Sequence, residues 1–459
     1  MIRLFNHHFR VQVLAQVLCD LLLIIAAFLG NYLLHGPEQF AKVPATEGLS
    51  LVAALLAVNT ASGLYRPASR PSFNRSWARA ALALLFALPM SYIAFSLLPG
   101  ELSGLNEMRW VTMVCVAAII THRGYAAHVD RQRDATRSRI LIFGSGASAQ
   151  LVARTISAAD PHVMIVGYVA GPNETLNLVE AGKTLSGIGS LKEKATELKV
   201  DEIVVALAER RGGSMPLREL LDCKIAGVQV SDLATYFEKV LGQIRIDQLH
   251  AGWLVFGNGF AQGNVRLTVK RVFDVLSSCV LLALAVPFML ITAMAITLES
   301  KGPVFYRQQR VGQHGRLFAV LKFRSMRAGA EKDGVPQWAA VNDSRVTRVG
   351  ALIRRIRLDE FPQLFNVLRG EMSLVGPRPE RPYFVEQLTR EIPFYAVRHS
   401  VKPGVTGWAQ VCYQYGATVQ DALEKLQYDL YYVKNHSLFL DIVVLFETIG
   451  VVLSGKGAR

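Results

Sequence analysis

The most informative stretch of the sequence is RRIRLDEFPQLFNVLRG, residues 354–370. Its apolar residues recur at the i, i+3, i+4, i+7 spacing that predicts one buried helical face. Pro362 is tolerated only in a first helical turn, and Gly370 is placed to end the helix. The stretch therefore predicts a helix whose N-terminus carries Asp359 and Glu360 beside three arginines.

Two adjacent carboxylates at a helix N-terminus suit phosphoryl chemistry. The free amides and the helix dipole at such a place attract anions such as a nucleotide diphosphate. One carboxylate could attack phosphorus while the other holds a metal ion. Magnesium suits the pair because it takes few carboxylates together with substrate phosphate oxygens. Asp359 and Glu360 are thus candidate catalytic and metal-binding residues, and helix capping is the alternative for the pair taken alone.

A second cationic feature lies upstream of this stretch. Residues 317–321 read as an apolar strand that runs into Lys322 and Arg324. Strand alternation would place these two side chains on one face. Two cations that project together suit a phosphate group, and a solvated strand edge is the alternative.

Residues 275–298 form an apolar segment without a charge, interrupted by Pro287. Lys270 and Arg271 precede it and Lys301 follows it, so a full span would leave one cationic cluster on the wrong side of the membrane. Proline in mid-helix removes a backbone hydrogen bond. We therefore predict a helix–break–helix that enters and leaves at the cytoplasmic face, with Lys270 and Arg271 on anionic headgroups. A fifth full span is the alternative.

The first quarter of the chain also favours a membrane protein. Charged residues make up 19% of the 459 residues, against about 25% in soluble proteins. Apolar stretches lie at 11–34, 49–64, 81–98 and 110–120. The first three suit the length of a spanning helix, and the fourth reaches it only if residues 121–127 extend it. Cation-rich loops alternate with cation-poor loops, which predicts four spans with both ends in the cytoplasm.

Residues 144–149, GSGASA, lie between a strand-like run at 138–143 and a helical run at 150–159. This G-x-G-x-x-A pattern in this setting is typical of a loop that cradles a dinucleotide diphosphate. Alternating strand and helix patterns predict a Rossmann-like α/β domain over residues 137–250. No acidic residue ends the second predicted strand to hold a ribose, so a structural or regulatory domain is the alternative.

Beyond residue 265 the chain resembles a known family. Four motifs carry the resemblance: KRxxD at 270–274, KFRSM at 322–326, LDExPQLxNV at 358–367 and GPRPE at 376–380. They are similar to those of the bacterial sugar transferases, also called monotopic phosphoglycosyl transferases. The architecture of the N-terminal half resembles the large subgroup, the polyprenyl-phosphate hexose-1-phosphate transferases of polysaccharide assembly. The break of the family's re-entrant helix is commonly Ser-Pro, whereas this chain has Val286-Pro287.

The resemblance implies an organisation in four parts. Residues 1–125 would form four transmembrane helices, and 137–250 the Rossmann-like domain. A linker at 251–265 would lead to the catalytic α/β domain at 266–459, with its re-entrant helix at 275–298. All soluble parts would face the cytoplasm from the bacterial inner membrane.

The resemblance also implies a reaction. A UDP-sugar, with glucose favoured and galactose next, would give its sugar-1-phosphate to undecaprenyl phosphate with release of UMP. This would be the first membrane step of exopolysaccharide, capsule or O-antigen synthesis. Asp359 would be the nucleophile that forms a covalent phosphosugar intermediate, and Glu360 would help to bind Mg²⁺. The implied substrate contacts are Lys322, Arg324, Arg354 and Arg378 for phosphate and Pro377, Pro379 and Glu380 near the uridine.

The expected partners are the UDP-sugar, undecaprenyl phosphate, membrane lipids, a second copy in a homodimer and downstream polysaccharide assembly enzymes. The net charge of +14 is assigned to lipid and phosphate ligands, and no nucleic acid is expected. Two other function classes compete with this interpretation. A membrane-tethered, nucleotide-dependent sugar-modifying enzyme would depend on residues 144–149 alone, and a non-catalytic polysaccharide-export scaffold would leave the Asp-Glu pair idle.

Overall fold

The computed structural model contains two compact units, chiefly residues 9–241 and 242–459. The segments that the structure describes are 2–4, 7–9, 11–35, 138–159, 163–171, 178–185, 190–207, 215–246, 259–260, 263–327, 345–413 and 418–453, with single positions at 113, 117, 120, 121, 124, 174 and 416. The predicted spans at 49–64 and 81–98, and most of 110–120 and of the linker 251–265, lie outside these residues.

The chain begins with two short strands and a long helix, and residues 3–8 of these strands group with the second unit. Strands β1 (Ile2–Leu4) and β2 (His7–Phe9) pair with each other. Helix α1 (Val11–His35) follows and coincides with the first predicted span.

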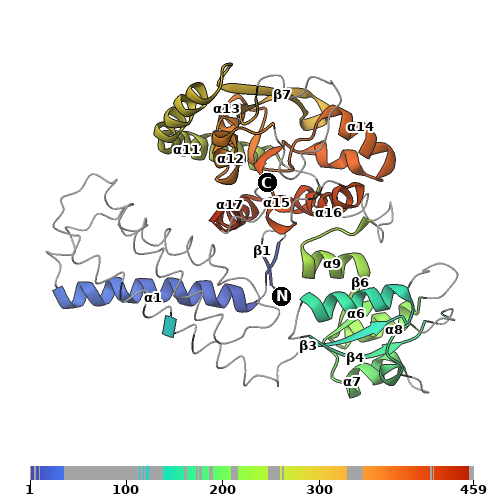
Figure 1. Cartoon of the computed structure of the whole chain (residues 1–459). Coiled ribbons are helices and arrows are strands. Elements are labelled where there is room, and N and C mark those ends of the chain that lie inside the picture. Colours follow the sequence, from blue (N-terminus) through green and yellow to red (C-terminus); the bar gives the residue numbers. More distant parts are fainter. Residues whose placement is uncertain are drawn as a thin grey trace. The chain divides into compact units, whose positions relative to one another are not determined.

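Among the described residues of the first unit, those from 138 to 241 form a parallel sheet with its helices, in the strand order β4-β3-β5-β6. The predicted α/β character of this region is confirmed. Its elements, drawn in teal to green in Figure 1, are β3 (Ser138–Phe143), α6 (Ala147–Ala159), β4 (Val163–Val169), the 3-10 helix η3 (Ala181–Lys183), α7 (Leu191–Glu197), β5 (Glu202–Val205), α8 (Leu217–Ile225), β6 (Gln229–Asp232) and α9 (Leu233–Leu241).

Helices cover both faces of this sheet. Ile140 and Ile142 of β3 point to the face that packs on α6 and α9, whereas Leu141 and Phe143 point to the face that packs on α7 and α8. Strand side chains alternate between faces, so a run of consecutive apolar residues such as 140–143 of β3 is what a sheet covered on both sides requires.

The glycine loop of this unit, residues 144–149, binds the side chain of Glu174. The backbone N–H of Ser145 donates to Glu174 Oε2 at 2.5 Å, the Ser145 hydroxyl donates at 3.1 Å, and the Gly171 N–H donates at 3.1 Å. A Cβ on Gly146 would lie 3.2 Å from Glu174 Oε1. A carboxylate therefore occupies the position where the sequence predicts a diphosphate.

The second unit is a mixed helical and α/β domain. Strands β7 and β8 form an antiparallel hairpin, and β9 pairs with β10 in parallel. Its elements are α11 (Asn264–Glu299), β7 (Phe305–Val311), η5 (Gln313–Gly315), β8 (Leu317–Phe323), α12 (Arg348–Arg355), η6 (Leu358–Glu360), α13 (Gln363–Arg369), β9 (Ser373–Val375), α14 (Pro382–Glu391), η7 (Tyr395–Ser400), β10 (Gly404–Thr406), α15 (Trp408–Cys412), α16 (Val419–Asn435) and α17 (Leu438–Leu453).

Helix α11 has one buried face and one exposed apolar face. Its buried residues, spaced by three or four positions, are Asp274, Ser278, Leu282, Ala285, Met289, Thr292 and Ile296. They pack toward α12, α13 and β9. The other face exposes large apolar side chains, from Leu276 to Leu298, the latter 81% exposed. Among the described residues, α11 is the one helix that is long and apolar enough to cross a membrane.

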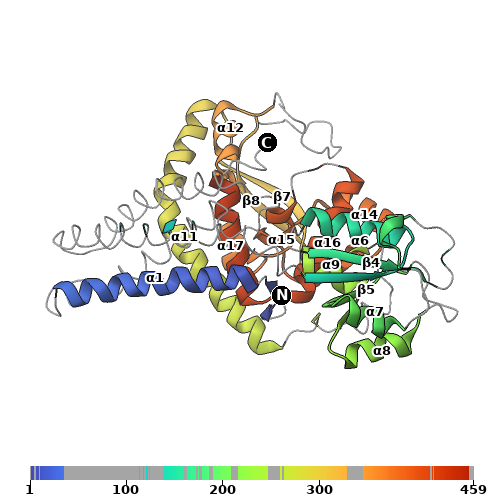
Figure 2. The same cartoon turned by 90° about the horizontal axis from the view of Figure 1, so that it is seen from below.

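The helical backbone of α11 continues through Pro287, where the sequence predicts a break. Figure 2 shows α11 as one continuous helix. Proline has no N–H, so the carbonyl of Ala283 loses its helical donor. Leu282 and Met289 are buried on either side of Pro287, and this shared packing holds both halves in one helix. The path of α11 relative to a bilayer stays a prediction.

Candidate active site

Asp359 and Glu360 lie in the 3-10 turn η6, between α12 and α13. The prediction of one α-helix that begins at this pair is therefore wrong in detail. Arg357 adopts a left-handed conformation with φ 56°, which ends α12, and Pro362 precedes the first residue of α13. The predicted helix end is confirmed, because Gly370 has φ 84° and glycine alone adopts this conformation without strain.

The predicted apolar face of this helix is only partly correct. Leu364 is buried and Leu368 packs against the core, as the spacing predicts. Phe365, however, is 38% exposed. The shorter helix starts at Gln363, so the i, i+4 relationship between Phe361 and Phe365 is not maintained across the turn.

Glu360 is 8% exposed and lies between cations. Its Oε1 atom accepts hydrogen bonds from Lys322 Nζ at 3.1 Å and from Arg378 Nη2 at 2.7 Å. Arg357 Nη1 lies 3.9 Å from Oε2. Burial by itself would raise the pKa of Glu360, but the charges of Arg378 and Lys322 outweigh it and hold that pKa well below its ordinary value. These cations favour the ionised form of Glu360.

Asp359 is half-buried and shows the opposite shift. Burial raises the pKa of Asp359, and the adjacent negative charge of Glu360 raises it further. Lys322, Arg354 and Arg378 act against this shift. Two neighbouring carboxyl groups whose environments push their pKa values apart divide naturally into two roles. Asp359 is the more basic of the two, and a more basic carboxylate is the better nucleophile.

Three of the predicted cations gather around the pair. Burial lowers the pKa of Lys322, while Glu360 opposes that shift. Arg354, in the last turn of α12, donates from Nε to Ser325 Oγ at 2.8 Å. These positions suit a phosphate group because it would meet several donors at once.

Arg324 does not belong to this cluster. Arg324 is 7% exposed. Its guanidinium donates to carbonyls at the end of α11, from Nη1 to Lys301 O at 2.8 Å and from Nη2 to Ser300 O at 2.7 Å. Cations stabilise helix C-termini in this way. The strand alternation does not extend to Arg324, because β8 ends at Phe323, and a phosphate contact of Arg324 stays a prediction.

In the GPRPE loop, residues 376–380, hydrogen bonds to the two prolines that flank Arg378 fix the loop backbone. The Gly404 N–H donates to Pro377 O at 3.0 Å, and Arg310 Nη1 donates to Pro379 O at 3.0 Å. Arg310 also lies 3.5 Å from Glu380. Both prolines are buried and their carbonyls are bonded. The loop is thereby fixed with the Arg378 side chain against Glu360, and the location of the uridine stays a prediction.

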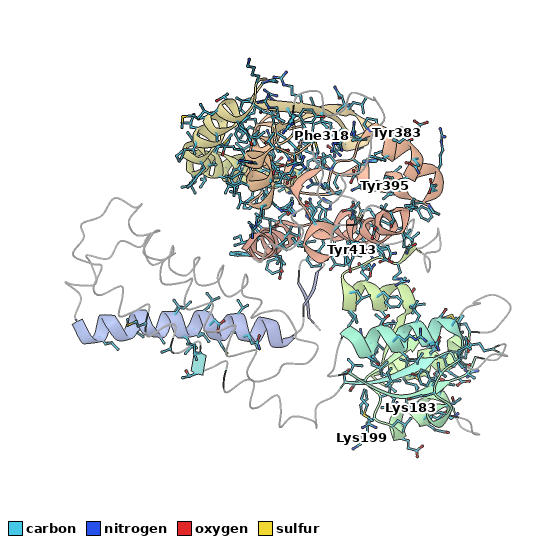
Figure 3. All side chains as sticks on the ribbon, viewed as in Figure 1. Lys183, Lys199, Phe318, Tyr383, Tyr395 and Tyr413 are labelled. Carbon is cyan, nitrogen blue, oxygen red and sulfur yellow. The ribbon has the colours of Figure 1, made fainter. Side chains whose placement is uncertain are left out.

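Several residues of the site were not found from the sequence. Gln410 of α15 accepts from Arg378 Nη1 at 3.0 Å. Arg398 pairs with buried Asp429 at 2.7 Å and donates to the backbone carbonyl of Arg378 at 2.9 Å. Tyr395, labelled in Figure 3, accepts from Arg398 Nη1 at 2.9 Å. These partners come from separate helices, so no local spacing could have indicated them.

Lys270 and Arg271 point into the second unit rather than toward headgroups. Lys270 Nζ lies 2.8 Å from Asp441 and 3.5 Å from Asp274, and its side chain is 17% exposed. Arg271 donates to backbone carbonyls of α13. The prediction that these two cations pair with anionic headgroups is therefore wrong, because both are bonded within the domain.

The donor set at η6 fits a magnesium ion that is shared with a substrate. No described group of three or more His, Cys, Asp and Glu residues could hold a metal. Asp359 and Oε2 of Glu360 offer two carboxylate ligands, since the cations bonded to Glu360 take Oε1. Mg²⁺ is usually held by one or two carboxylates together with substrate phosphates and water. The metal itself stays a proposal.

Known proteins resemble the chain over this region. A family model described as bacterial sugar transferase matches residues 265–455. The UDP-N-acetylgalactosamine-undecaprenyl-phosphate N-acetylgalactosaminephosphotransferase of Aeromonas hydrophila is 46% identical over 242 residues, 53% of this chain and 56% of the relative. The UDP-glucose:undecaprenyl-phosphate glucose-1-phosphate transferase of Xanthomonas campestris pv. campestris is 34% identical over 357 residues, 75% of this chain and 72% of the relative.

An Escherichia coli K12 protein with the same name as the Xanthomonas relative is 36% identical over 265 residues, 56% of each chain. The matched region thus spans little more than half the length of the Aeromonas and Escherichia relatives.

Proposed function

The chain belongs to the bacterial sugar transferase family, and we propose that it transfers a sugar-1-phosphate from a UDP-sugar to undecaprenyl phosphate, with release of UMP. The observation that carries the proposal is the Asp359–Glu360 pair. The Glu360 carboxylate is held as an anion between cations. The Asp359 carboxylate is more basic, and none of the contacts described above gives it a cation at hydrogen-bond distance. This division of roles suits a nucleophile beside a charge-organising neighbour.

In the first half of the proposed reaction, Asp359 attacks the phosphorus that carries the sugar. The bond between this phosphorus and the bridging oxygen breaks, and UMP leaves with that oxygen. The product is an acyl phosphate that joins Asp359 to the sugar phosphate. Lys322, Arg354 and Arg378 neutralise the charge that develops on the phosphoryl oxygens and on the leaving group.

In the second half, a phosphate oxygen of undecaprenyl phosphate attacks the same phosphorus. The bond to the Asp359 oxygen breaks, which restores the carboxylate and yields undecaprenyl-diphospho-sugar. No net proton transfer is required. Glu360 cannot readily replace Asp359, because its Oε1 atom is bonded to Lys322 and Arg378, and its part is to hold these cations in place. Bound Mg²⁺, held by the two carboxylates, would add positive charge beside the diphosphate.

The membrane part of the proposal depends on α11. Its outer face exposes a continuous series of large apolar side chains, which water solvates poorly and lipid tails accept. We propose that α11 lies in the cytoplasmic leaflet of the bacterial inner membrane as a re-entrant helix. This path requires α11 to bend at Pro287, where the helix lacks one backbone hydrogen bond. Cysteines introduced at Gly263 and Lys301, on either side of α11, would then both react from the cytoplasm only. Labelling of Lys301→Cys from the periplasm would show a full span.

The identity of the donor sugar is a separate part of the proposal. The family resemblance favours glucose, and the Xanthomonas and Escherichia relatives carry glucose in their names. The Aeromonas relative, 46% identical, carries N-acetylgalactosamine instead. We propose these two UDP-sugars as the donors to compare first.

The proposed function is tested by incubating the protein in lipid with undecaprenyl phosphate and a panel of UDP-sugars. Release of UMP with one donor and formation of a lipid-linked sugar are expected. Absence of both products with every UDP-sugar would contradict the proposal and favour the export-scaffold alternative.

A further inference from the structure

The start of α11 is tied to three other parts of the second unit by three polar side chains. Lys270 pairs with Asp441 of α17 at 2.8 Å. Asp274 accepts from the backbone N–H of Leu374, in β9, at 3.3 Å. Arg271, between them in the sequence, reaches α13, the helix that follows the catalytic turn. The helix with the exposed apolar face is therefore attached to the catalytic core at its first turns.

The Arg271 guanidinium forms a bidentate contact with two backbone carbonyls of α13, called here the Arg271 clamp. Nη1 donates to Val367 O at 2.5 Å and Nη2 donates to Leu368 O at 2.7 Å. Val367 O also accepts from the Gly370 N–H at 2.9 Å, in the turn that ends α13. A cation at a helix C-terminus also interacts favourably with the negative end of the helix dipole. The planar guanidinium satisfies two carbonyls at once, which a lysine ammonium cannot match in geometry.

Helix α13 carries this attachment to the reacting carboxylate. It has seven residues, a length of about 10 Å at 1.5 Å per residue, and η6 with Asp359 lies just before its first turn. The side-chain amide of Asn366, in α13, makes two hydrogen bonds with β8. Its Nδ2 donates to Ala319 O at 2.8 Å, and its Oδ1 accepts from the Leu321 N–H at 3.0 Å. The nucleophile and the strand that carries Lys322 therefore move with α13.

We infer that Arg271 is a positioning residue that sets the depth of Asp359 relative to α11, and hence its distance from the headgroup plane. This inference rests on the proposed function. A soluble UDP-sugar can diffuse to Asp359 at any depth, whereas the phosphate of a polyprenyl lipid is confined to the headgroup plane. Loss of the clamp therefore impairs transfer to the lipid more than it impairs attack on the soluble donor.

The test measures the two half-reactions separately in vesicles with Arg271→Gln and Arg271→Lys. The first readout is the rate at which UDP-sugar labels the protein without acceptor. The second is the rate at which undecaprenyl phosphate in the bilayer removes the label. The third is the same discharge by a short, water-soluble prenyl phosphate.

For Arg271→Gln we expect unchanged labelling, discharge to the bilayer acceptor about 10-fold to 100-fold slower, and near-normal discharge to the soluble acceptor. Arg271→Lys retains one donor to the carbonyls, so its defect should be of the same kind and smaller. Arg369→Gln is the matched control, because this exposed arginine lies in the last turn of the same helix. All three of its rates should equal those of the wild type.

An equal loss in all three rates would overturn the inference, because it would indicate a general loss of structure or of catalysis. Unchanged discharge to the bilayer acceptor in both Arg271 variants would overturn it as well. Absence of label on the wild-type protein would overturn the proposed function, and the inference with it.

Discussion

Asp359 and Glu360 are consecutive residues of one 3-10 turn, yet the pKa values of their carboxyl groups are shifted in opposite directions. The cause is the placement of the cations. Lys322 and Arg378 donate to Glu360, whereas Asp359 is affected mainly by burial and by the charge of Glu360. A pair of neighbouring acids is thereby divided into a fixed anion and a basic carboxylate.

This division predicts how the labelling rate depends on pH. Asp359 must be deprotonated to attack, and its pKa is raised, so the rate should fall as the pH falls through that raised pKa. Glu360→Gln removes a negative neighbour and frees two cations to act on Asp359. Both changes lower the pKa of Asp359, so the acid limb of this variant should move to lower pH while its maximal rate falls. Single-turnover labelling across a pH series measures both effects, and an acid limb that moves to higher pH would contradict the assignment.

Arg324 and Lys322 are two residues apart but should behave differently when neutralised. Arg324→Gln removes the cation at the end of α11 and should lower thermal stability while leaving the KM for UDP-sugar close to that of the wild type. Lys322→Gln removes a donor beside Glu360 and should raise the KM or slow the labelling rate with little loss of stability. A strong KM effect of Arg324→Gln in a stable protein would restore it to the phosphate site.

The buried Arg398–Asp429 pair should support both stability and the position of Arg378. Removing one partner of a buried ion pair costs about 3–5 kcal/mol, so Asp429→Asn should lower the free energy of unfolding of the second unit by that order. The exposed pair of Arg390 and Glu386 is the control, since surface pairs contribute about 0–1 kcal/mol. Denaturant unfolding in detergent compares Asp429→Asn with Glu386→Gln, and equal stability of the two variants would contradict the prediction.

Glu174 should act as the internal ligand of the glycine loop. Glu174→Gln weakens three hydrogen bonds to a charged acceptor, which should reduce stability by about 1–3 kcal/mol. Hydrogen exchange of the full chain should show lost protection at residues 144–147, and Glu180→Gln, an exposed residue of the same unit, should not change it. Protection of this loop in the wild type by added NAD⁺ or UDP-sugar would show that Glu174 is displaced and that the domain binds a nucleotide.

The sequence predicts those features that depend on neighbouring residues. Gly370 could be placed at a helix end because a left-handed residue after an apolar stripe favours glycine. The apolar strand at 138–143 could be recognised because both faces of its sheet are covered. The importance of Asp359 and Glu360 followed from their adjacency and from the motifs around them.

What the sequence did not predict depends on contacts between distant segments. The sequence around Arg324 suggests a phosphate contact, because no neighbouring residue indicates that the end of α11 lies beside it. Gln410 and Arg398 reach Arg378 from other helices, and Glu174 reaches the glycine loop from beyond β4. Lys270 and Arg271 flank an apolar segment, a pattern typical of headgroup contacts, yet carboxylate and carbonyl partners within the domain bind them.

The central claim is that Asp359 forms a covalent bond to the sugar phosphate. The most direct measurement is mass spectrometry of the protein after brief mixing with UDP-sugar in the absence of lipid acceptor. The account predicts one sugar-phosphate adduct on the peptide that contains Asp359, its loss when undecaprenyl phosphate is added, and no adduct in Asp359→Asn. An adduct that persists in Asp359→Asn, or UMP release by that variant at the wild-type rate, would contradict it.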